Sequence, residues 1–283
     1  MAISIVAASC SKEAGSAPTS PVNENGEQSQ FIAYTEGADG TKTYLENLSI
    51  KFHDGDEVSM FAGSTLAAKY QVTDSEGRTA ASLTKVKNSS SFGAGTEINA
   101  NVAYYPYSSG VSVEMVSGGY YVVSATLPET QSYHENSFGQ DAFPMVAVTD
   151  GSDDFDLNFK NICGVVELKV KGNVTVEKIT IAGNSGEPLW GSYSVKAAYG
   201  ETPVATLSGD GATVILDCGS GVQLNQNNET SFMITLPPVS FQGGFTVVIN
   251  ASDGTSMTKS TNNEQNIVRN KILAMPSFEY IAN

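Results

Sequence analysis

The residue types that carry most enzyme chemistry are scarce in this chain. Its 283 residues include two histidines and three cysteines. His53 precedes the run Asp54-Gly55-Asp56, and His134 lies in the polar run 132–136. Neighbouring Asp and Gly residues favour tight turns, so we expect both imidazoles in turns or loops rather than beside a nucleophile.

Hydrolysis needs a nucleophile beside an imidazole, or two carboxyl groups across a cleft. No Gly-x-Ser-x-Gly turn occurs in the sequence to present a serine. The pairs Asp54/Asp56 and Asp153-Asp154 fall in turn-like runs, where Asp is common. The run 150–156 is dense in oxygen ligands but lacks the EF-hand spacing. We therefore predict a protein that is not an enzyme, with no catalytic residue, no metal site and no cofactor.

Aromatic residues gather in a few short segments, and exposed rings of this kind can bind sugars through the faces of the rings. The candidate sugar-binding residues are Tyr105, Tyr107, Trp190 and Tyr193. The alternative is that they belong to the core, because successive residues of a strand point to opposite faces.

Cys163 and Cys218 lie in strand-like runs of the second half of the chain. Export to an oxidising compartment favours a disulfide between them. The alternative is two buried thiols that pack as small apolar residues.

The N-terminus indicates export. A short apolar run ends in Ala7-Ala8-Ser9 just before Cys10, which looks like a bacterial lipobox. We expect residues 1–10 to be a lipoprotein signal with Cys10 as the lipidated residue, held in the membrane by several acyl chains. Residues 11–30 are polar and without apolar periodicity, which predicts a flexible tether. The localisation expected is the outer membrane and cell surface.

The charge of the chain argues against nucleic acid as a partner. Charged residues make up 16% of the sequence, and the formal net charge is −15. Binding to phosphates needs a basic surface. Sparse and diffuse negative charge fits a solubilised extracellular β protein instead.

The elements that must position these residues are strands. From Phe31 onward apolar residues recur at every second position, as in half-buried antiparallel strands. The clearest runs are 155–159, 166–170, 174–181, 232–236 and 245–249, and turn signals rich in Gly separate them. Short strands joined by hairpins suggest β-sandwiches. The length indicates two domains, 31–150 and 151–283, divided at the polar run 149–154.

Several segments, in order, resemble the motifs of fimbrillin-like proteins, the major and minor fimbrial subunit (Mfa-like) family. They are Lys51-Phe52-His53-Asp54-Gly55-Asp56-Glu57-Val58-Ser59-Met60-Phe61-Ala62, Ala103-Tyr104-Tyr105-Pro106-Tyr107, the run 141–145, Phe159-Lys160-Asn161-Ile162-Cys163-Gly164-Val165, the run 179–184, Leu236-Pro237-Pro238, Gly244-Phe245-Thr246-Val247 and Arg269-Asn270-Lys271-Ile272. The resemblance covers the chain from about residue 31 to the C-terminus.

The resemblance implies an outer-membrane lipoprotein of Gram-negative anaerobes, with two tandem transthyretin-like antiparallel β-sandwich domains. Members are stalk, tip or anchor subunits of fimbriae. In those that polymerise, a protease cuts after a basic residue and removes the first strand, and a strand of the next subunit fills the groove. Physically this is strand addition to a sheet edge.

This sequence departs from the polymerising pattern in its basic residues. Its two arginines, Arg78 and Arg269, lie away from the first strand, which leaves Lys42 and Lys51 as candidate processing positions. No long C-terminal donor strand is expected beyond Met275–Ile281. We therefore expect a fimbrial subunit of the tip or accessory kind that acts in adhesion or assembly, with other subunits, the membrane and a glycan or host receptor as partners. The alternative is a stand-alone glycan- or host-binding surface lipoprotein.

Overall fold

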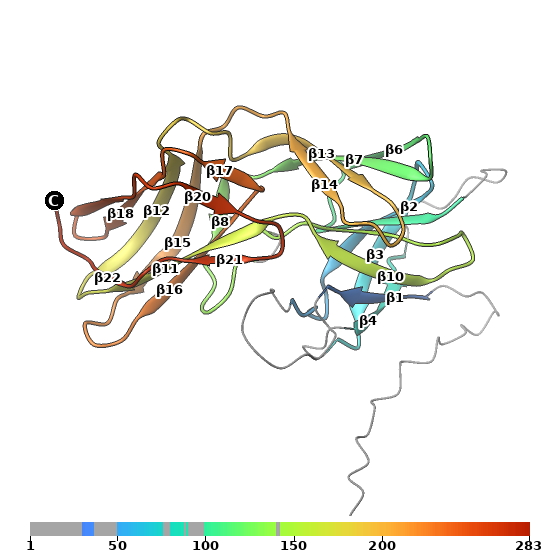
Figure 1. Cartoon of the computed structure of the whole chain (residues 1–283). Coiled ribbons are helices and arrows are strands. Elements are labelled where there is room, and N and C mark those ends of the chain that lie inside the picture. The colour runs from blue at the N-terminus through green and yellow to red at the C-terminus, as the bar shows by residue number, and fades with distance from the viewer. Residues whose placement is uncertain (1–29, 37–49, 76–79, 88, 90–98, 140–141) are drawn as a thin grey trace, which may run out of the picture.

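The computed structural model describes residues 30–36, 50–75, 80–87, 89, 99–139 and 142–283 (Figure 1). Within these ranges the regular elements are all strands, so the prediction of an all-β protein is confirmed. A helix long and apolar enough to cross a membrane is not found in this part of the chain. The finer expectation of two transthyretin-like sandwiches stays a prediction.

The strands form a closed sheet, three open sheets and one two-stranded ribbon. The closed sheet runs in the order β1 (Gln30–Thr35), β10 (Asp156–Asn161), β9 (Met145–Val148), β5 (Asn101–Tyr105), β2 (Glu57–Ala62), β3 (Thr65–Thr73) and β4 (Ala80–Lys85). The second sheet has the order β14 (Val204–Leu207), β13 (Gly191–Ala197), β7 (Tyr120–Leu127) and β6 (Ser112–Val116). The third has the order β19 (Ser256–Ser260), β18 (Phe245–Ala251), β12 (Thr175–Gly183), β15 (Thr213–Gln223) and β8 (Thr130–Ser132). The fourth joins β16 (Thr230–Leu236), β11 (Gly164–Lys171), β21 (Ile272–Ala274) and β22 (Phe278–Glu279), and the ribbon pairs β17 (Val239–Phe241) with β20 (Gln265–Ile267).

The alternating runs of the sequence become strands with one buried face. In β18, for example, residues 245, 247, 249 and 251 are buried and those between them are half-buried. In β12 the buried positions change from Val176 to Ile179, which breaks the period of two. A β-bulge between Val176 and Lys178 absorbs the extra residue, so the apolar side chains stay on one face.

The Gly-rich turns supply backbone conformations that other residues adopt at a cost. Gly118 and Gly119 join β6 to β7 with φ angles of 79° and 76°. The loop between the paired residues Val116 and Tyr120 has three residues, 117–119. Glycine adopts positive φ without steric cost, so two of these three positions suit glycine.

The buried apolar residues form two clusters. The first combines side chains of the closed sheet with others from β6, β7 and β13. The second lies among β11, β12, β15, β16 and β18. Trp190 packs against both clusters. Its Cε2 would lie 2.1 Å from a Cβ added at Gly211, so a residue without a side chain is needed there.

The strands do not follow the predicted boundary between residues 150 and 151. β10 lies beyond it and yet completes the closed sheet with β1 and β9. β13 pairs with β7 of the first half, and β8 of the first half pairs with β15. The polar run 149–154 is the connection between the neighbouring strands β9 and β10, so it is a turn and not a linker between domains.

Two buried polar contacts join the sheets. The hydroxyl groups of Tyr104 and Tyr193 hydrogen-bond to each other between the closed sheet and β13. The side-chain amide of Gln131, on β8, donates to the backbone oxygen of Thr235 and accepts from its backbone nitrogen, at 2.7 and 2.9 Å. The amide thus fills hydrogen-bonding positions on the outer edge of β16.

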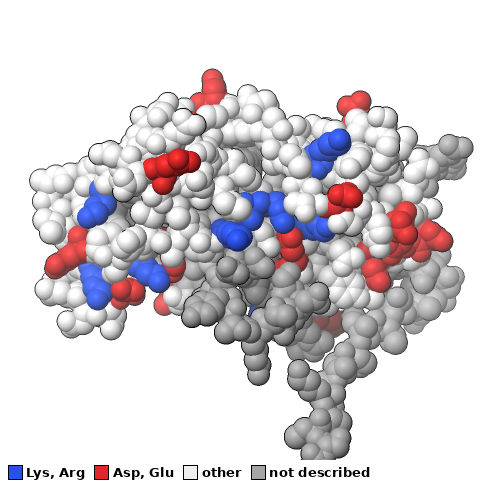
Figure 2. All heavy atoms as spheres, viewed as in Figure 1, with Lys and Arg blue, Asp and Glu red and all other residues white. Residues whose placement is uncertain are grey.

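The surface carries little charge for its size. On the face shown in Figure 2, small groups of Lys and Arg side chains lie between Asp and Glu side chains, and most of the surface belongs to other residues. Both signs of charge are thus interspersed on this face.

Candidate functional site

The first strand is paired on both sides. Residues of β1 lie antiparallel to β4, with Phe31 opposite Leu83, and parallel to β10, with Thr35 opposite Phe159. β1 therefore completes the closed sheet. Its removal would leave two unpaired edges, on β4 and β10, along a groove the length of one short strand.

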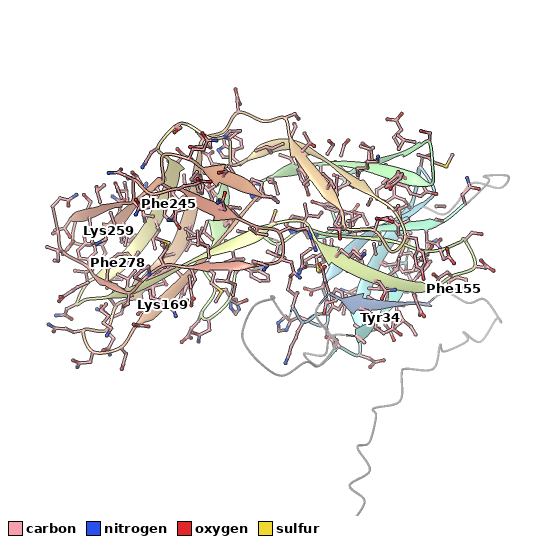
Figure 3. The ribbon with its side chains drawn as sticks, viewed as in Figure 1. Tyr34, Phe155, Lys169, Phe245, Lys259 and Phe278 are labelled. Carbon is pink, nitrogen blue, oxygen red and sulfur yellow. The ribbon has the colours of Figure 1, made fainter. Side chains whose placement is uncertain are left out.

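The side chains of β1 anchor it in the core. Phe31 and Ile32 are 4% and 8% exposed. The ring of Phe31 lies 5.5 Å from that of Tyr70 and 5.3 Å from that of Phe155. Tyr34, on the same strand, and Phe155 lie at the closed sheet in Figure 3. Each buried large apolar side chain stabilises the fold by roughly 1.5–3 kcal/mol, so an emptied groove needs another occupant.

A polar cluster fastens the end of β1 to the C-terminal part of the chain. The two terminal guanidinium nitrogens of Arg269 donate to the carboxylate of Glu36, at 2.5 and 2.8 Å. The same carboxylate accepts from the backbone nitrogen of Asn161 at 3.0 Å. The Asn161 side chain donates to Asn270, whose backbone nitrogen donates to the oxygen of Cys163 at 2.9 Å. β1, β10 and the segment before β21 therefore share one hydrogen-bonded cluster.

The C-terminal segment lies along β11. β21 and β22 are parallel to β11, with Val165 opposite Ile272 and Val170 opposite Phe278. The ammonium of Lys259 lies 5.6 Å from the centre of the Phe278 ring. Both residues are labelled in Figure 3. Tyr280 is 9% exposed, and its hydroxyl is 2.8 Å from the Thr255 hydroxyl. This segment is thus an edge strand docked on the second core.

The processing positions are described only in part. Lys51 is exposed and lies between β1 and β2. Lys42 and the lipidation candidate Cys10 lie outside the described residues. The flanking residues Ile50 and Phe52 are buried, at 7% and 1% exposed, so only the side chain of Lys51 is accessible.

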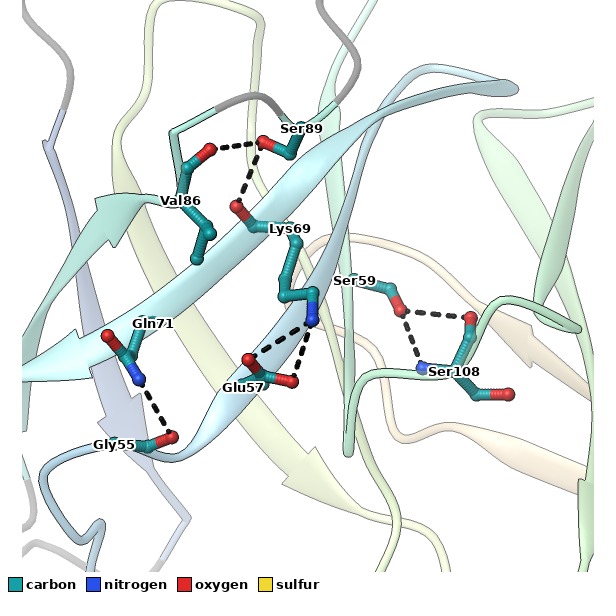
Figure 4. A network of polar contacts seen from close by, with 8 residues as sticks. All are labelled: Gly55, Glu57, Ser59, Lys69, Gln71, Val86, Ser89 and Ser108. Carbon is teal, nitrogen blue, oxygen red and sulfur yellow. Dashed lines mark hydrogen bonds and ion pairs between the residues drawn. The ribbon is translucent and has the colours of Figure 1, made fainter.

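The ring of Tyr107 is covered by a charged side chain. The ammonium of Lys69 lies 4.4 Å from the centre of the ring. The same ammonium donates to both carboxylate oxygens of Glu57, at 3.0 and 3.1 Å; Figure 4 shows this ion pair. In the same network the hydroxyl of Ser59 accepts from the backbone nitrogen of Ser108 at 3.1 Å. Tyr107 is therefore half-buried, with Lys69 over its ring, instead of presenting a bare ring.

The other three aromatic candidates are structural. Tyr105 and Tyr193 are 8% and 3% exposed, so their rings offer no face to a sugar. Trp190 is half-buried between the two clusters. The structure does not bring these residues together as an exposed platform, because both faces of β5, which carries Tyr105, are covered and Tyr193 lies on a buried face of β13.

The two histidines, distant in sequence, line one pocket. It has a volume of about 560 Å³, and its walls include His53, His134, Tyr105 and Phe143. Both imidazoles are exposed. The sequence pattern placed the two histidines in separate turns and did not indicate that they line the same pocket. Only the order of the strands in the fold brings them to it.

The paired aspartates stabilise turns. Asp54 accepts from the backbone nitrogen and hydroxyl of Ser75 at 2.8 and 2.7 Å. Asp56 accepts from the backbone nitrogen of His53. Asp154 accepts from the backbone nitrogens of residues 150 and 156, at 3.1 and 3.0 Å. Across the described ranges no group of three His, Cys, Asp or Glu side chains could hold a metal ion.

Cys163 and Cys218 are free thiols in the structure. Cys163 belongs to the first cluster and Cys218 to the second. Burial raises the pKa of both thiols, that of Cys218 to about 12, where the charge of Asp217 adds to the effect. Of the two alternatives, disulfide or buried thiols, the structure has the buried thiols, and the two sulfurs lie in different cores.

An exposed aromatic residue that sequence reasoning passed over is Tyr199. It follows β13 in the connection to β14, and its side chain is 50% exposed. It lines a pocket of about 290 Å³ with Asn158, Lys160 and Glu201. Tyr199 does not belong to a cluster of aromatic residues in the sequence, so it was not selected. The signal that could have found it is the following Gly200, which is typical of turns.

Comparison with known proteins shows a shared fold. Neither a protein-family model nor a curated protein sequence matches this chain. Among solved structures, a candidate cell adhesion protein from Bacteroides ovatus matches with a TM-score of 0.51 and 13% identity over 88% of this chain and 91% of that one. A candidate cell adhesion protein from Bacteroides uniformis matches with a TM-score of 0.47 and 13% identity, over 89% of this chain and 94% of that one. Another, from Bacteroides fragilis, matches with a TM-score of 0.41 and 10% identity, over 85% of this chain and 83% of that one.

Proposed function

We propose that this chain is a fimbrillin-like surface protein that acts in adhesion or fimbrial assembly and joins a neighbouring subunit by strand addition. The observation that carries the proposal is β1, a six-residue strand that pairs on both sides and completes a closed sheet. An exchanged strand would recover the same hydrogen bonds with β4 and β10, and its alternate side chains would fill the space of Phe31 and Ala33. A non-enzymatic role is part of the proposal.

The exchange needs an accessible cut between β1 and β2. Exposed Lys51 supports one site, and Lys42 is the other candidate. A subunit that exchanges one strand with one neighbouring subunit fits a tip or accessory position. Cys10 would attach the chain to the outer membrane through lipid, with residues 11–30 as the tether.

The test is the state of the full chain on the surface of a Gram-negative host that lipidates outer-membrane proteins. We expect SDS-resistant ladders in unboiled membrane extracts and a mature N-terminus after Lys42 or Lys51 in the assembled material. Lys42→Gln with Lys51→Gln should remove the ladder. Lys87→Gln, at another exposed lysine, is the matched control and should keep it.

The lipid anchor has its own test. Cys10→Ser should release the protein from membranes while its fold is unchanged. If all the protein on the cell surface were monomeric and still contained β1, the assembly proposal would be contradicted. Release of the unmodified chain without lipid would contradict the anchor alone.

A further inference from the structure

Two valines of β9, Val146 and Val148, lie on the outer face of the closed sheet. In β10 the side chains of Leu157 and Phe159 are buried in the core, so Asn158 and Lys160 point outward. Val146 of β9 is the register partner of Lys160 and shares its face. Val146 and Val148 are nevertheless only 2% and 7% exposed. They are covered because the second sheet packs against this face.

The connection between β13 and β14 forms the rim of a pocket over these valines. The pocket has a volume of about 290 Å³, near the lower end of the range for small-molecule sites, roughly 300 Å³ and above. The ammonium of Lys160 donates to the backbone oxygens of Gly200 and Glu201, at 2.7 and 2.8 Å. These two bonds join the rim to β10 and engage the ammonium.

The remaining lining has an aromatic ring and polar groups on an apolar floor. Among the large apolar side chains that are exposed in the described ranges, the aromatic one is Tyr199. Asn158 and Glu201, both exposed, contribute an amide and a carboxylate to the same lining. An amide offers donors and acceptors, and a carboxylate accepts strongly from hydroxyl groups.

We propose that this pocket binds one neutral sugar ring of a glycan. The faces of pyranose rings carry CH groups that pack on an aromatic face, and their hydroxyl groups suit the amide and the carboxylate. The Glu201 carboxylate and the net charge of −15 disfavour sugars that carry carboxylate or sulfate. The inference rests on the proposed surface role for access to glycans, and on the geometry of the pocket for the ligand class.

The test measures binding of simple sugars to the full chain. The probes are the methyl glycosides of glucose, galactose, mannose and N-acetylglucosamine, followed by nuclear magnetic resonance of the labelled protein. At least one should bind saturably, with a Kd on the order of 1 mM, as expected for a small ligand with few contacts. N-acetylneuraminic acid, which is acidic, should bind at least tenfold more weakly.

Variants locate the site. Tyr199→Ala should weaken binding at least tenfold, and Tyr199→Phe should retain it because the ring is kept. The control is Tyr120→Ala: Tyr120 faces Lys196, whose ammonium lies 4.0 Å from its ring, and it is not part of the pocket lining. Thermal unfolding checks that each variant is folded.

No saturable binding of any neutral glycoside, equal binding by Tyr199→Ala, or preference for the acidic sugar would overturn the inference. The surface ladder is a separate readout that none of these variants should change. If the ladder forms but no sugar binds, this inference is wrong and the assembly proposal stands. If a sugar binds but no ladder forms, the assembly proposal is wrong and this inference stands.

Discussion

Glu36 and Arg269, 233 positions apart, form an ion pair in which two guanidinium nitrogens bind the two carboxylate oxygens. Their side chains are 24% and 20% exposed. The pair connects the end of β1 with the segment that precedes β21. The strand proposed to exchange is therefore fastened to the C-terminal segment as well as to its neighbours in the sheet.

Glu36→Gln should lower the free energy of unfolding by about 2 kcal/mol, because it leaves a partly buried guanidinium without its charged partner. Urea unfolding measures this change. The matched control is Glu57→Gln, which breaks the more exposed pair with Lys69, 41% and 28% exposed, and should cost less than about 1 kcal/mol. Equal losses in the two variants would show that the Glu36 pair has no special role.

Glu36→Gln should also loosen β1. If the ion pair restrains this strand, the variant should exchange the amide hydrogens of β1 faster than the wild type under native conditions. Amides of β18, in the second core, should not change. A uniform change across both cores would instead mean a general loss of stability.

Gln131→Ala should destabilise the protein by about 1–3 kcal/mol, because the backbone nitrogen and oxygen of Thr235 lose a partner in a buried position. Urea unfolding measures the change. Exposed Gln242→Ala is the control, expected within about 0.5 kcal/mol of the wild type. A Gln131→Ala variant as stable as the wild type would contradict the assignment.

Cys163 and Cys218 should not react with a thiol reagent in the native protein, because burial keeps them protonated and out of contact with solvent. In the Cys10→Ser variant, unfolding without reductant should release two reactive thiols. A titration in denaturant counts them. If unfolding released none, the two sulfurs would be oxidised to a disulfide, contrary to their separation into two cores.

Stability should fall at alkaline pH. Burial raises the pKa of the Cys163 thiol and of the Tyr104 and Tyr193 hydroxyls above their ordinary values of 9.0 and 10.0. The unfolded chain releases these protons first, so the stabilisation is complete below about pH 8 and decreases as the pH rises past 9 to 10. Urea unfolding across this interval measures the slope. Tyr104→Phe with Tyr193→Phe should flatten it, and an unchanged slope would contradict the assignment.

Local patterns in the sequence predicted the strands well. Alternation marks β10, β11, β16 and β18, because a strand exposes successive residues to opposite sides wherever it pairs. The irregular spacing in the run 174–181 reflects a bulge that depends on the partners β15 and β18. A single strand carries no record of its partners, so its sequence could not predict the bulge.

The candidate sugar-binding residues show the limit of sequence patterns. Clustering of aromatic residues pointed to Tyr105 and Tyr193, which are buried, and passed over Tyr199, which is exposed. Whether a ring faces solvent depends on the sheet packed against its strand. That second sheet comes from both halves of the chain.

By itself the sequence determined the all-β class, the positions of many strands and turns, and the scarcity of catalytic side chains, since these follow from composition and from interactions between near neighbours. The tertiary structure alone decided that β10 joins β1, that Cys163 and Cys218 lie in separate cores, that Glu36 meets Arg269, and that a pocket forms beside Tyr199. Each of these depends on contacts between segments distant in sequence, and such contacts are selected by the packing of the whole chain and not by any local pattern.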